Sequence, residues 1–329
     1  MSNSVGGHFA SAADTALEAT IVGSWTSLGF RARRRLYGWQ PVGREDAAGK
    51  VVVITGATSG LGKAAATRLA GVGAHLVLVG RDQARTNTIA EQLRQRFGND
   101  NVEAAIADLA DLGAVETLAQ DLLDRLGRLD SLVHNAGALT HEYTATDDGI
   151  ELTFQAHVVA PFLLTERLLP LLQATPGSRV VTMSSGGMYA EPLVVDRVEM
   201  VEDHYDGVRA YARAKRAQVV LNAEWARRFP QGPSFYALHP GWADTPGVVD
   251  SLPGFHRITG PFLRTPDQGA DTMVWLSVAG DVPDASGSFW LDRRQRGTVY
   301  RPGTSTSEAD SRRLWDLVST QTQGVRPTR

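Results

Sequence analysis

The sequence predicts an α/β protein built on a single doubly wound parallel sheet of about seven strands. Three observations predict this class. Short apolar runs rich in β-branched residues alternate with longer stretches of helical periodicity from residue 50 onward. Several of these runs are apolar throughout, which is typical of parallel strands that helices cover on both faces. Glycine or polar residues follow the runs, at the carboxyl edge of the sheet where such folds bind ligands.

The elements are expected in strict alternation. The runs that predict strands are 51–54, 75–79, 102–106, 129–134, 179–183, 234–238 and 288–291. Helical periodicity begins near Leu61 and recurs over 83–97, 111–126, 150–173, 211–229 and, near the end of the chain, 308–318. No linker interrupts the alternation, so residues 50–295 are expected to form one domain with helical extensions at 1–49 and 296–329.

Residues 15–39 predict a helix with one apolar face. Thr15 and Glu18 have the spacing of a capping box, which marks a helix start. The face that follows consists of Leu17, Ile21, Trp25 and Leu28. Because arginines and aromatic residues come next, peripheral contact with a membrane is one interpretation. The apolar stripe is short, so we favour a helix docked on the main domain with solvated arginines at its end.

The composition excludes several classes of protein. The 329 residues include 33 Lys and Arg against 36 Asp and Glu, and a net charge of −3 provides no general field for binding nucleic acid. Without cysteine, the chain forms no disulfide and no thiolate metal site. No uninterrupted apolar stretch reaches about 18 residues, so no membrane span is predicted. The first residues also lack the pattern of a signal peptide, and we expect a cytoplasmic protein.

A glycine pattern, TGxxxGxG, follows the first strand. Gly56 permits a tight turn, Gly60 lets the backbone approach a pyrophosphate, and Gly62 allows close packing of helix on strand. The helix that follows directs its free N–H groups at the phosphates. This turn is therefore predicted to bind a dinucleotide through Gly56, Ser59, Gly60, Leu61 and Gly62.

The end of the second strand indicates which dinucleotide is bound. An acidic residue there would accept hydrogen bonds from the adenosine ribose and repel a 2′-phosphate. Gly80 takes that place and Arg81 follows, which suits the 2′-phosphate and favours NADP (NADPH) over NAD. The alternative is that Arg81 is a surface residue beside Asp82.

The other strand ends also carry polar or glycine-rich residues. Asp108 and Leu109 are expected beside the adenine, and Asn135, Ala136 and Gly137 where the cofactor passes. Asn135 could equally serve to tie adjacent strands together. The fifth and sixth strands are followed by Ser184-Ser185 and by a loop with the cofactor candidates Pro240, Gly241 and Thr245.

Tyr211 and Lys215 lie four residues apart on a predicted helix, so their side chains share a face. A free tyrosine has a pKa of about 10, too high for a base at neutral pH. A nearby ammonium favours the phenolate, so the pKa of Tyr211 is expected to be lowered for proton transfer.

These motifs together resemble the short-chain dehydrogenase/reductase (SDR) family over residues 50–295. The stretches at 183–188, 239–248 and 268–276 narrow the resemblance to the retinol-dehydrogenase-like group. The resemblance implies a Rossmann fold in which Tyr211 transfers a proton, Lys215 holds the nicotinamide ribose, and Ser185 binds the substrate oxygen. It also implies that Thr245 holds the nicotinamide carboxamide. Pairing of two copies through helices of the central sheet is common in the family, so a homo-oligomer is expected.

One residue departs from the family pattern. The family usually carries a catalytic Asn in the long helix after the fourth strand, and His157 stands at that place. A histidine can donate and accept hydrogen bonds, so His157 could replace the Asn in the proton relay. The alternative, a histidine that only packs in a degraded relay, is equally open.

We therefore expect an NADP-dependent oxidoreductase that acts on a small-molecule carbonyl or alcohol. Residues 246–264 are expected to cover the substrate, and their apolar side chains favour a lipophilic one. These side chains are Val248, Val249, Leu252, Phe255, Phe262 and Leu263. The alternative is a non-catalytic dinucleotide-binding or scaffold protein that kept the fold.

Overall fold

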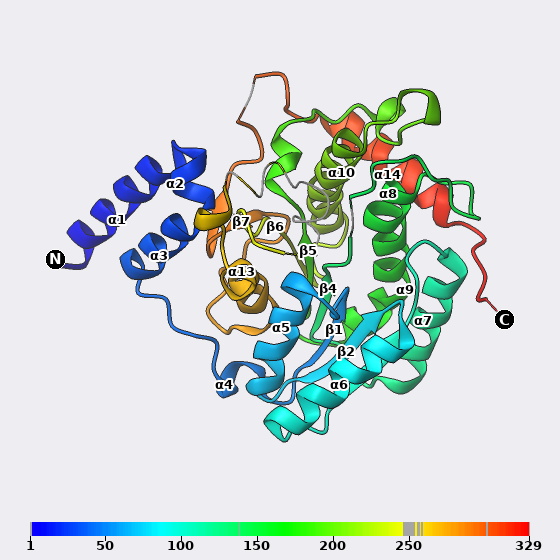
Figure 1. Ribbon diagram of the computed structural model, residues 1–329, viewed down its shortest axis with the longest axis horizontal. Helices are drawn as coiled ribbons and strands as arrows, with labels where there is room; N and C mark the ends of the chain where they lie inside the picture. Colours follow the sequence, from blue (N-terminus) through cyan, green and yellow to red (C-terminus); the bar gives the residue numbers. More distant parts are fainter. Residues whose placement is uncertain are drawn as a thin grey trace.

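The computed structural model describes residues 2–137, 139–245, 254, 257, 259–300 and 302–328. Within these residues the chain forms a sheet with the strand order β3-β2-β1-β4-β5-β6-β7-β8 (Figure 1). All pairs are parallel except the last. The strands are β1 (Val51–Thr55), β2 (His75–Gly80), β3 (Val102–Ile106), β4 (Ser131–His134), β5 (Arg179–Met183), β6 (Ser234–Leu238), β7 (Phe289–Leu291) and β8 (Arg294–Arg296). The predicted doubly wound parallel sheet is confirmed.

Strand β8 was not predicted. It pairs with β7 in antiparallel register through a two-residue turn at Asp292 and Arg293, whose φ angles are 54° and 52°. Such turns normally use Asn or Gly, which tolerate positive φ. The sequence at this turn therefore carries no hairpin signal.

Helices cover both faces of the sheet and create two large hydrophobic cores. Successive residues of β1 point to opposite faces, so Val51 and Val53 enter one core and Val52 and Ile54 the other. The first core is closed by α7 (Leu112–Arg125), α9 (Ala160–Ala174), α10 (Gly207–Arg228) and α14 (Glu308–Thr322). The second is closed by α5 (Gly60–Gly71), α6 (Gln83–Phe97) and α13 (Pro266–Val278).

The helix predicted over 150–173 is interrupted by a π-helical turn. A short α8 (Leu152–Phe154) precedes the turn at Gln155–Val159, and α9 continues from it. The N–H of Ala160 donates to the carbonyl of Gln155, five residues back. Pro161 then has no N–H for the carbonyl of His157, which instead accepts from Gln218 Nε2 at 2.8 Å.

The N-terminal extension forms four helices rather than the one predicted. They are α1 (Ser2–Glu18), α2 (Ile21–Trp25), α3 (Ser27–Leu36) and α4 (Arg44–Ala47). Thr15 is not at a helix start, because it lies in α1 and its hydroxyl donates to the carbonyl of Ser11. The break after α1 also places Leu28 in solvent, 66% exposed, while Trp25 is buried. The predicted capping box and continuous apolar stripe are therefore wrong.

The arginines of α3 are not all solvated as predicted. Arg31, Arg34 and Arg35 are not buried, whereas Arg33 is fully buried. Its guanidinium contacts Asp14, Glu18 and Asp292, the last on the main sheet. These contacts confirm that the N-terminal helices dock on the domain. Membrane contact through residues 15–39 stays a prediction from the sequence.

At the other end of the chain, α14 packs across α9 and α10. Leu314 and Val318 are completely buried against this surface. Trp315 lies between the helices, with ring centroids 4.8 Å from Phe162 and 4.5 Å from Trp225. The helix predicted over 308–318 thus forms and covers one flank of the domain.

None of the helices in the described part of the chain is long and apolar enough to cross a bilayer. The cytoplasmic location and the homo-oligomer remain predictions from the sequence.

Replacing Trp315 with Ala should lower the free energy of unfolding by about 2 kcal/mol, because it removes a partly buried aromatic ring that packs on Phe162 and Trp225. Urea denaturation measures this change. Arg312→Ala, in an exposed pair with Glu308 on the same helix, is the control and should change stability by less than about 0.5 kcal/mol. Equal effects of the two substitutions would contradict the packing of α14.

Candidate active site

The four predicted catalytic residues lie together at the carboxyl edge of the sheet. Tyr211 and Lys215 are one turn apart on α10, with Lys215 Nζ 5.3 Å from the centroid of the Tyr211 ring. Ser185 directly follows Ser184 at the end of β5, and its side chain lies beside that of Tyr211. The His157 ring meets the Tyr211 ring edge-on, with centroids 5.4 Å apart.

Lys215 is held in place by the end of β5. Its side chain is buried, and Nζ donates to the carbonyl of Met183 at 2.8 Å. The hydroxyl of Ser184 donates in turn to the carbonyl of Lys215 at 2.9 Å. Burial of the ammonium lowers the pKa of Lys215 to about 7.

The pKa of Tyr211 differs from the sequence-based expectation. Burial raises the pKa of Tyr211, although the hydrogen bond from Ser185 lowers it in part. The prediction of a lowered value was therefore wrong in direction. Loss of phenolate hydration in the buried site outweighs the stabilisation available from neighbouring groups.

His157 is buried in the π-helical turn with a defined tautomer. Its Nδ1 lies 2.8 Å from the carbonyl oxygen of Thr153, which can only accept, so Nδ1 carries the proton. Nε2 is thus an acceptor, and it has no hydrogen-bond partner among the described residues. Burial, with a smaller contribution from Lys215, lowers the pKa of His157 to about 3 and keeps the ring neutral.

Gly137 borders the same nitrogen. A Cβ added at this position would overlap Nε2 of His157, so a side chain cannot be accommodated between β4 and the π-helical turn. The backbone after β4 therefore lies directly against the predicted catalytic histidine.

The glycine turn after β1 has the shape expected of a phosphate loop. Gly56 has φ +67° and passes so close to Ala136 that an added Cβ would be 2.7 Å from the Ala136 Cα. Gly60 has φ +50°, and an added Cβ on Gly62 would overlap the carbonyl of Gly56. Ser59 stands at the N-cap of α5, with Leu61 in the first turn. The backbone at this helix start fits a pyrophosphate.

Asn135 ties β4 to the phosphate loop. Its Nδ2 donates to the carbonyl of Thr55 at 3.0 Å and to that of Gly56 at 3.2 Å. Its backbone N–H donates to the Thr55 hydroxyl at 3.0 Å. The strand-tying role that the sequence left open is present.

The predicted 2′-phosphate site lies at the end of β2. Arg81 is exposed there, and no described residue forms an ion pair with it. Asp82 accepts the N–H of Arg85 at 2.9 Å as the N-cap of α6, so its carboxylate serves the helix. At the end of β3, Asp108 is exposed and Leu109 is buried.

The loop after β6 lies beside the glycine turn that follows β1. An added Cβ on Gly60 would lie 3.5 Å from the side chain of Thr245. Gly241 has φ +74°, and the carbonyl of Pro240 accepts from Arg264 Nη1 at 3.1 Å. The sequence did not reveal Arg264 or its partners Trp25 and Asp292, because nothing in a single sequence links positions so far apart.

Replacing Lys215 with Met should raise the thermal midpoint at pH 6 by roughly a few degrees, because a buried ammonium is removed. The folded-state pKa of about 7 lies below the ordinary lysine value of 10.5, so below about pH 7 the wild type carries the full burial cost. The gain should shrink as the pH rises from 7 toward 10. Lys63→Met, at an exposed position of α5, is the control, and a gain independent of pH would contradict the lowered pKa.

Known proteins resemble this chain over most of its length. The short chain dehydrogenase family model matches residues 50–195. Dehydrogenase/reductase SDR family member 12 of Homo sapiens is 37% identical over 272 residues, which are 82% of this chain and 85% of that protein. Retinol dehydrogenase 14 of Mus musculus is 34% identical over 288 residues, with coverage of 82% and 84%. A crystal structure of an uncharacterised protein from Mycobacterium paratuberculosis matches with TM-score 0.69 and 27% identity, covering 88% of this chain and 100% of its own. The chain therefore belongs to the short-chain dehydrogenase/reductase family and is an NAD(P)-dependent oxidoreductase.

Proposed function

We propose that the protein interconverts a lipophilic carbonyl compound and its alcohol with NADP, through Ser185, Tyr211 and Lys215. The observation that carries this proposal is the grouping of three side chains beside Ser185: Lys215 Nζ lies 5.3 Å from the centroid of the Tyr211 ring, and the His157 ring meets that ring edge-on at 5.4 Å. These groups lie beyond the same sheet edge as the glycine turn that fits a pyrophosphate.

When bound, the nicotinamide supplies or accepts the hydride. Ser185 donates a hydrogen bond to the substrate oxygen and stabilises the negative charge that develops there. Tyr211 donates a proton to that oxygen during reduction and removes it during oxidation. Because burial raises the pKa of Tyr211, its proton is retained at neutral pH, which favours carbonyl reduction.

Lys215 and His157 assist Tyr211 in different ways. The Lys215 ammonium, 5.3 Å from the Tyr211 ring centroid, stabilises the phenolate that forms when the proton leaves. It also holds the nicotinamide ribose. His157 offers Nε2 as a neutral acceptor beside Gly137, and in this role it replaces the usual Asn in the proton relay.

The cofactor is held by residues after five strands. The glycine turn after β1 binds the pyrophosphate, Arg81 binds the 2′-phosphate, and Asp108 binds the adenine. Arg81 is free for this role because Asp82 already serves as a helix cap. The backbone at 135–137 lines the path of the cofactor, and Thr245 binds the carboxamide.

Two observations support a lipophilic substrate: the name of a relative, and an exposed aromatic residue in the segment 246–264 that is predicted to cover the substrate. One relative, retinol dehydrogenase 14, is named for retinol, an apolar alcohol. Phe262 is 57% exposed next to the loop that carries Arg264. Val248, Val249, Leu252 and Phe255 of that segment lie outside the described residues.

Replacing Tyr211 with Phe should lower turnover of a retinal or long-chain aldehyde by at least about 100-fold, because the proton donor is lost. Affinity for NADPH, measured by isothermal titration calorimetry, should stay within about threefold. Tyr236→Phe is the matched control, since Tyr236 is buried in β6 and belongs to the second core.

Near-normal turnover of the Tyr211→Phe variant would contradict the mechanism. NADPH binding by the wild type without turnover of any carbonyl in a panel of long-chain, ring and small polar substrates would favour the non-catalytic alternative. Better turnover of small polar carbonyls would contradict the lipophilic assignment.

Replacing Arg81 with Ala should weaken NADPH binding by about 10- to 100-fold and leave NADH binding unchanged, because a charge-assisted contact to the 2′-phosphate is removed. Fluorescence titration with each nucleotide measures the two affinities. Arg96→Ala at the far end of α6 is the control. Equal affinity of the wild type for NADPH and NADH would contradict the preference for NADP.

A further inference from the structure

The end of helix α2 reaches the active site and contacts two of its loops. Trp25, the last residue of α2, is 8% exposed. Its ring meets His239 at 4.9 Å and Trp242 at 5.9 Å between centroids, both edge-on. It also stacks on Tyr189 at 6.0 Å. The N-terminal extension is therefore in contact with the segments that follow β5 and β6.

The contact with the first loop is close to Ser185. An added Cβ on Gly186 would lie 2.5 Å from Cζ3 of Trp25, so the indole covers the backbone of the residue next to Ser185. The Ser185 hydroxyl accepts the N–H of Gly187 at 3.2 Å within the same turn. The position of this hydroxyl therefore depends on a turn that rests on the Trp25 ring.

The contact with the second loop involves the Trp25 carbonyl. It accepts the N–H of Trp242 at 2.7 Å and Nε of Arg264 at 3.0 Å. Gly241, with φ +74°, passes so close that an added Cβ would be 2.7 Å from this carbonyl oxygen. One residue thus joins the Ser185 turn to the loop of Pro240, Gly241 and Thr245.

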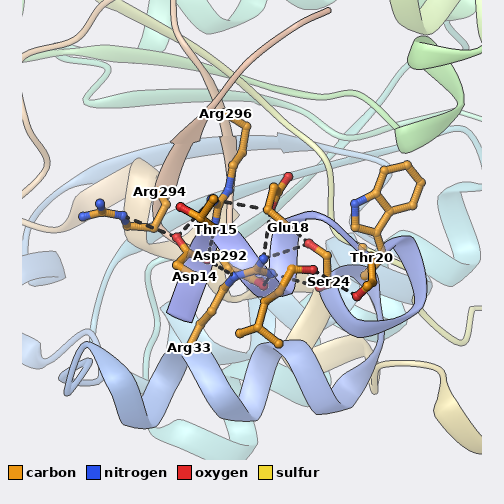
Figure 2. Close-up of polar contacts among 12 residues, drawn as sticks. Asp14, Thr15, Glu18, Thr20, Ser24, Arg33, Asp292, Arg294 and Arg296 are labelled. Carbon is orange, nitrogen blue, oxygen red and sulfur yellow. Dashed lines mark hydrogen bonds and ion pairs between the residues drawn. The ribbon is translucent and has the colours of Figure 1, made fainter. Parts of the chain in front are cut away.

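A buried network of charges fixes α2 in this place (Figure 2). The carbonyl of Ser24 accepts from Arg33 Nη1 and from Arg264 Nη2, both at 2.9 Å. Both arginines bind Asp292, which is 1% exposed in the turn between β7 and β8. Arg33 also binds Asp14 and Glu18 of α1. The network therefore anchors α2 to the central sheet.

Arg264 is also the last residue of the segment predicted to cover the substrate, and its backbone contacts the loop after β6. Its backbone N–H donates to the carbonyl of Trp242 at 2.7 Å, and its carbonyl accepts the N–H of Asp244 at 2.8 Å. Arg264, the last residue of the segment, is thus joined to Trp242 and Asp244 in the loop after β6, and it also binds α2.

We propose that Trp25 is a positioning residue for the reaction, which sets the Ser185 turn against the cofactor loop at 239–245 and makes the N-terminal extension part of the active site. This inference rests on the proposed function, because the reaction that Trp25 serves is the one assigned to Ser185, Tyr211 and Lys215. It implies that Trp25 acts through Ser185 and contributes little to binding of NADPH.

A double-mutant cycle between Trp25 and Gly186 tests the contact. Trp25→Leu should lower kcat about tenfold and leave the Kd for NADPH within about threefold, because the Ser185 turn loses its support. Gly186→Ala should lower kcat by a similar factor, because its methyl group overlaps the indole. The double variant should have a kcat close to that of Trp25→Leu alone, since leucine leaves room for the methyl group.

Trp315→Leu is the control for loss of a packed indole, since Trp315 lies between Phe162 and Trp225. It should lower the thermal midpoint about as much as Trp25→Leu does, with kcat unchanged. Trp25→Phe should recover most of the lost kcat. Independent, multiplicative effects of Trp25→Leu and Gly186→Ala would overturn the proposal, and so would a loss of kcat that Trp315→Leu reproduces.

Amide hydrogen exchange separates this proposal from the proposed function. In Trp25→Leu, exchange at residues 186–190 and at Trp242 should be faster by about tenfold or more, while exchange in α14 should stay unchanged. A wild type that turns over no carbonyl would refute the proposed function without affecting this measurement. Unchanged exchange at 186–190 would overturn the role of Trp25 whatever the turnover.

Discussion

The arrangement of the N-terminal helices, the last two strands and the loop after β6 depends on the burial of Asp292. Its carboxylate accepts from Arg33 at 2.8 Å and from Arg264 at 2.5 and 2.8 Å, and both arginines are themselves buried. Charges removed from water in this way are tolerated only when every partner is in place, since an unpaired buried charge costs several kcal/mol. The three segments that supply these side chains must therefore assemble together.

At the catalytic edge of the sheet, burial has the opposite effect and favours uncharged side chains. There the same loss of hydration lowers the pKa of Lys215 and raises that of Tyr211. Both shifts favour the neutral forms, which for Tyr211 is the protonated phenol that donates a proton in the proposed carbonyl reduction. The sequence could indicate that Tyr211 and Lys215 share a helix face, but it could not show how deeply they are buried. The predicted direction for Tyr211 was wrong for this reason.

The fold was more predictable than the details of the site. The strand over 179–183 has in the structure the limits that were predicted, because its β-branched residues and its polar ends are local signals. The turn at Asp292 and Arg293 has no such signal, and the N-terminal helices are held by contacts with residues more than 200 positions away. Ser185, Tyr211 and His157 were predicted to meet, and the structure brings them together. The role of Trp25 in that arrangement depends on tertiary contacts alone.

In the π-helical turn before α9, Pro161 determines which groups the side chain of His157, four residues earlier, faces. An α-helix advances by about 100° per residue, so loss of the inserted residue would rotate everything before the turn by that angle relative to α9. His157 would then leave the Tyr211 ring and Gly137. Pro161 disfavours this regular alternative, because a continuous helix needs an N–H that proline lacks, and Gln218 supplies the donor instead. The π-helical turn therefore sets the position of His157 in the site. An insertion or deletion between 152 and 161 would displace His157 and change the reaction centre, even where the fold stayed the same.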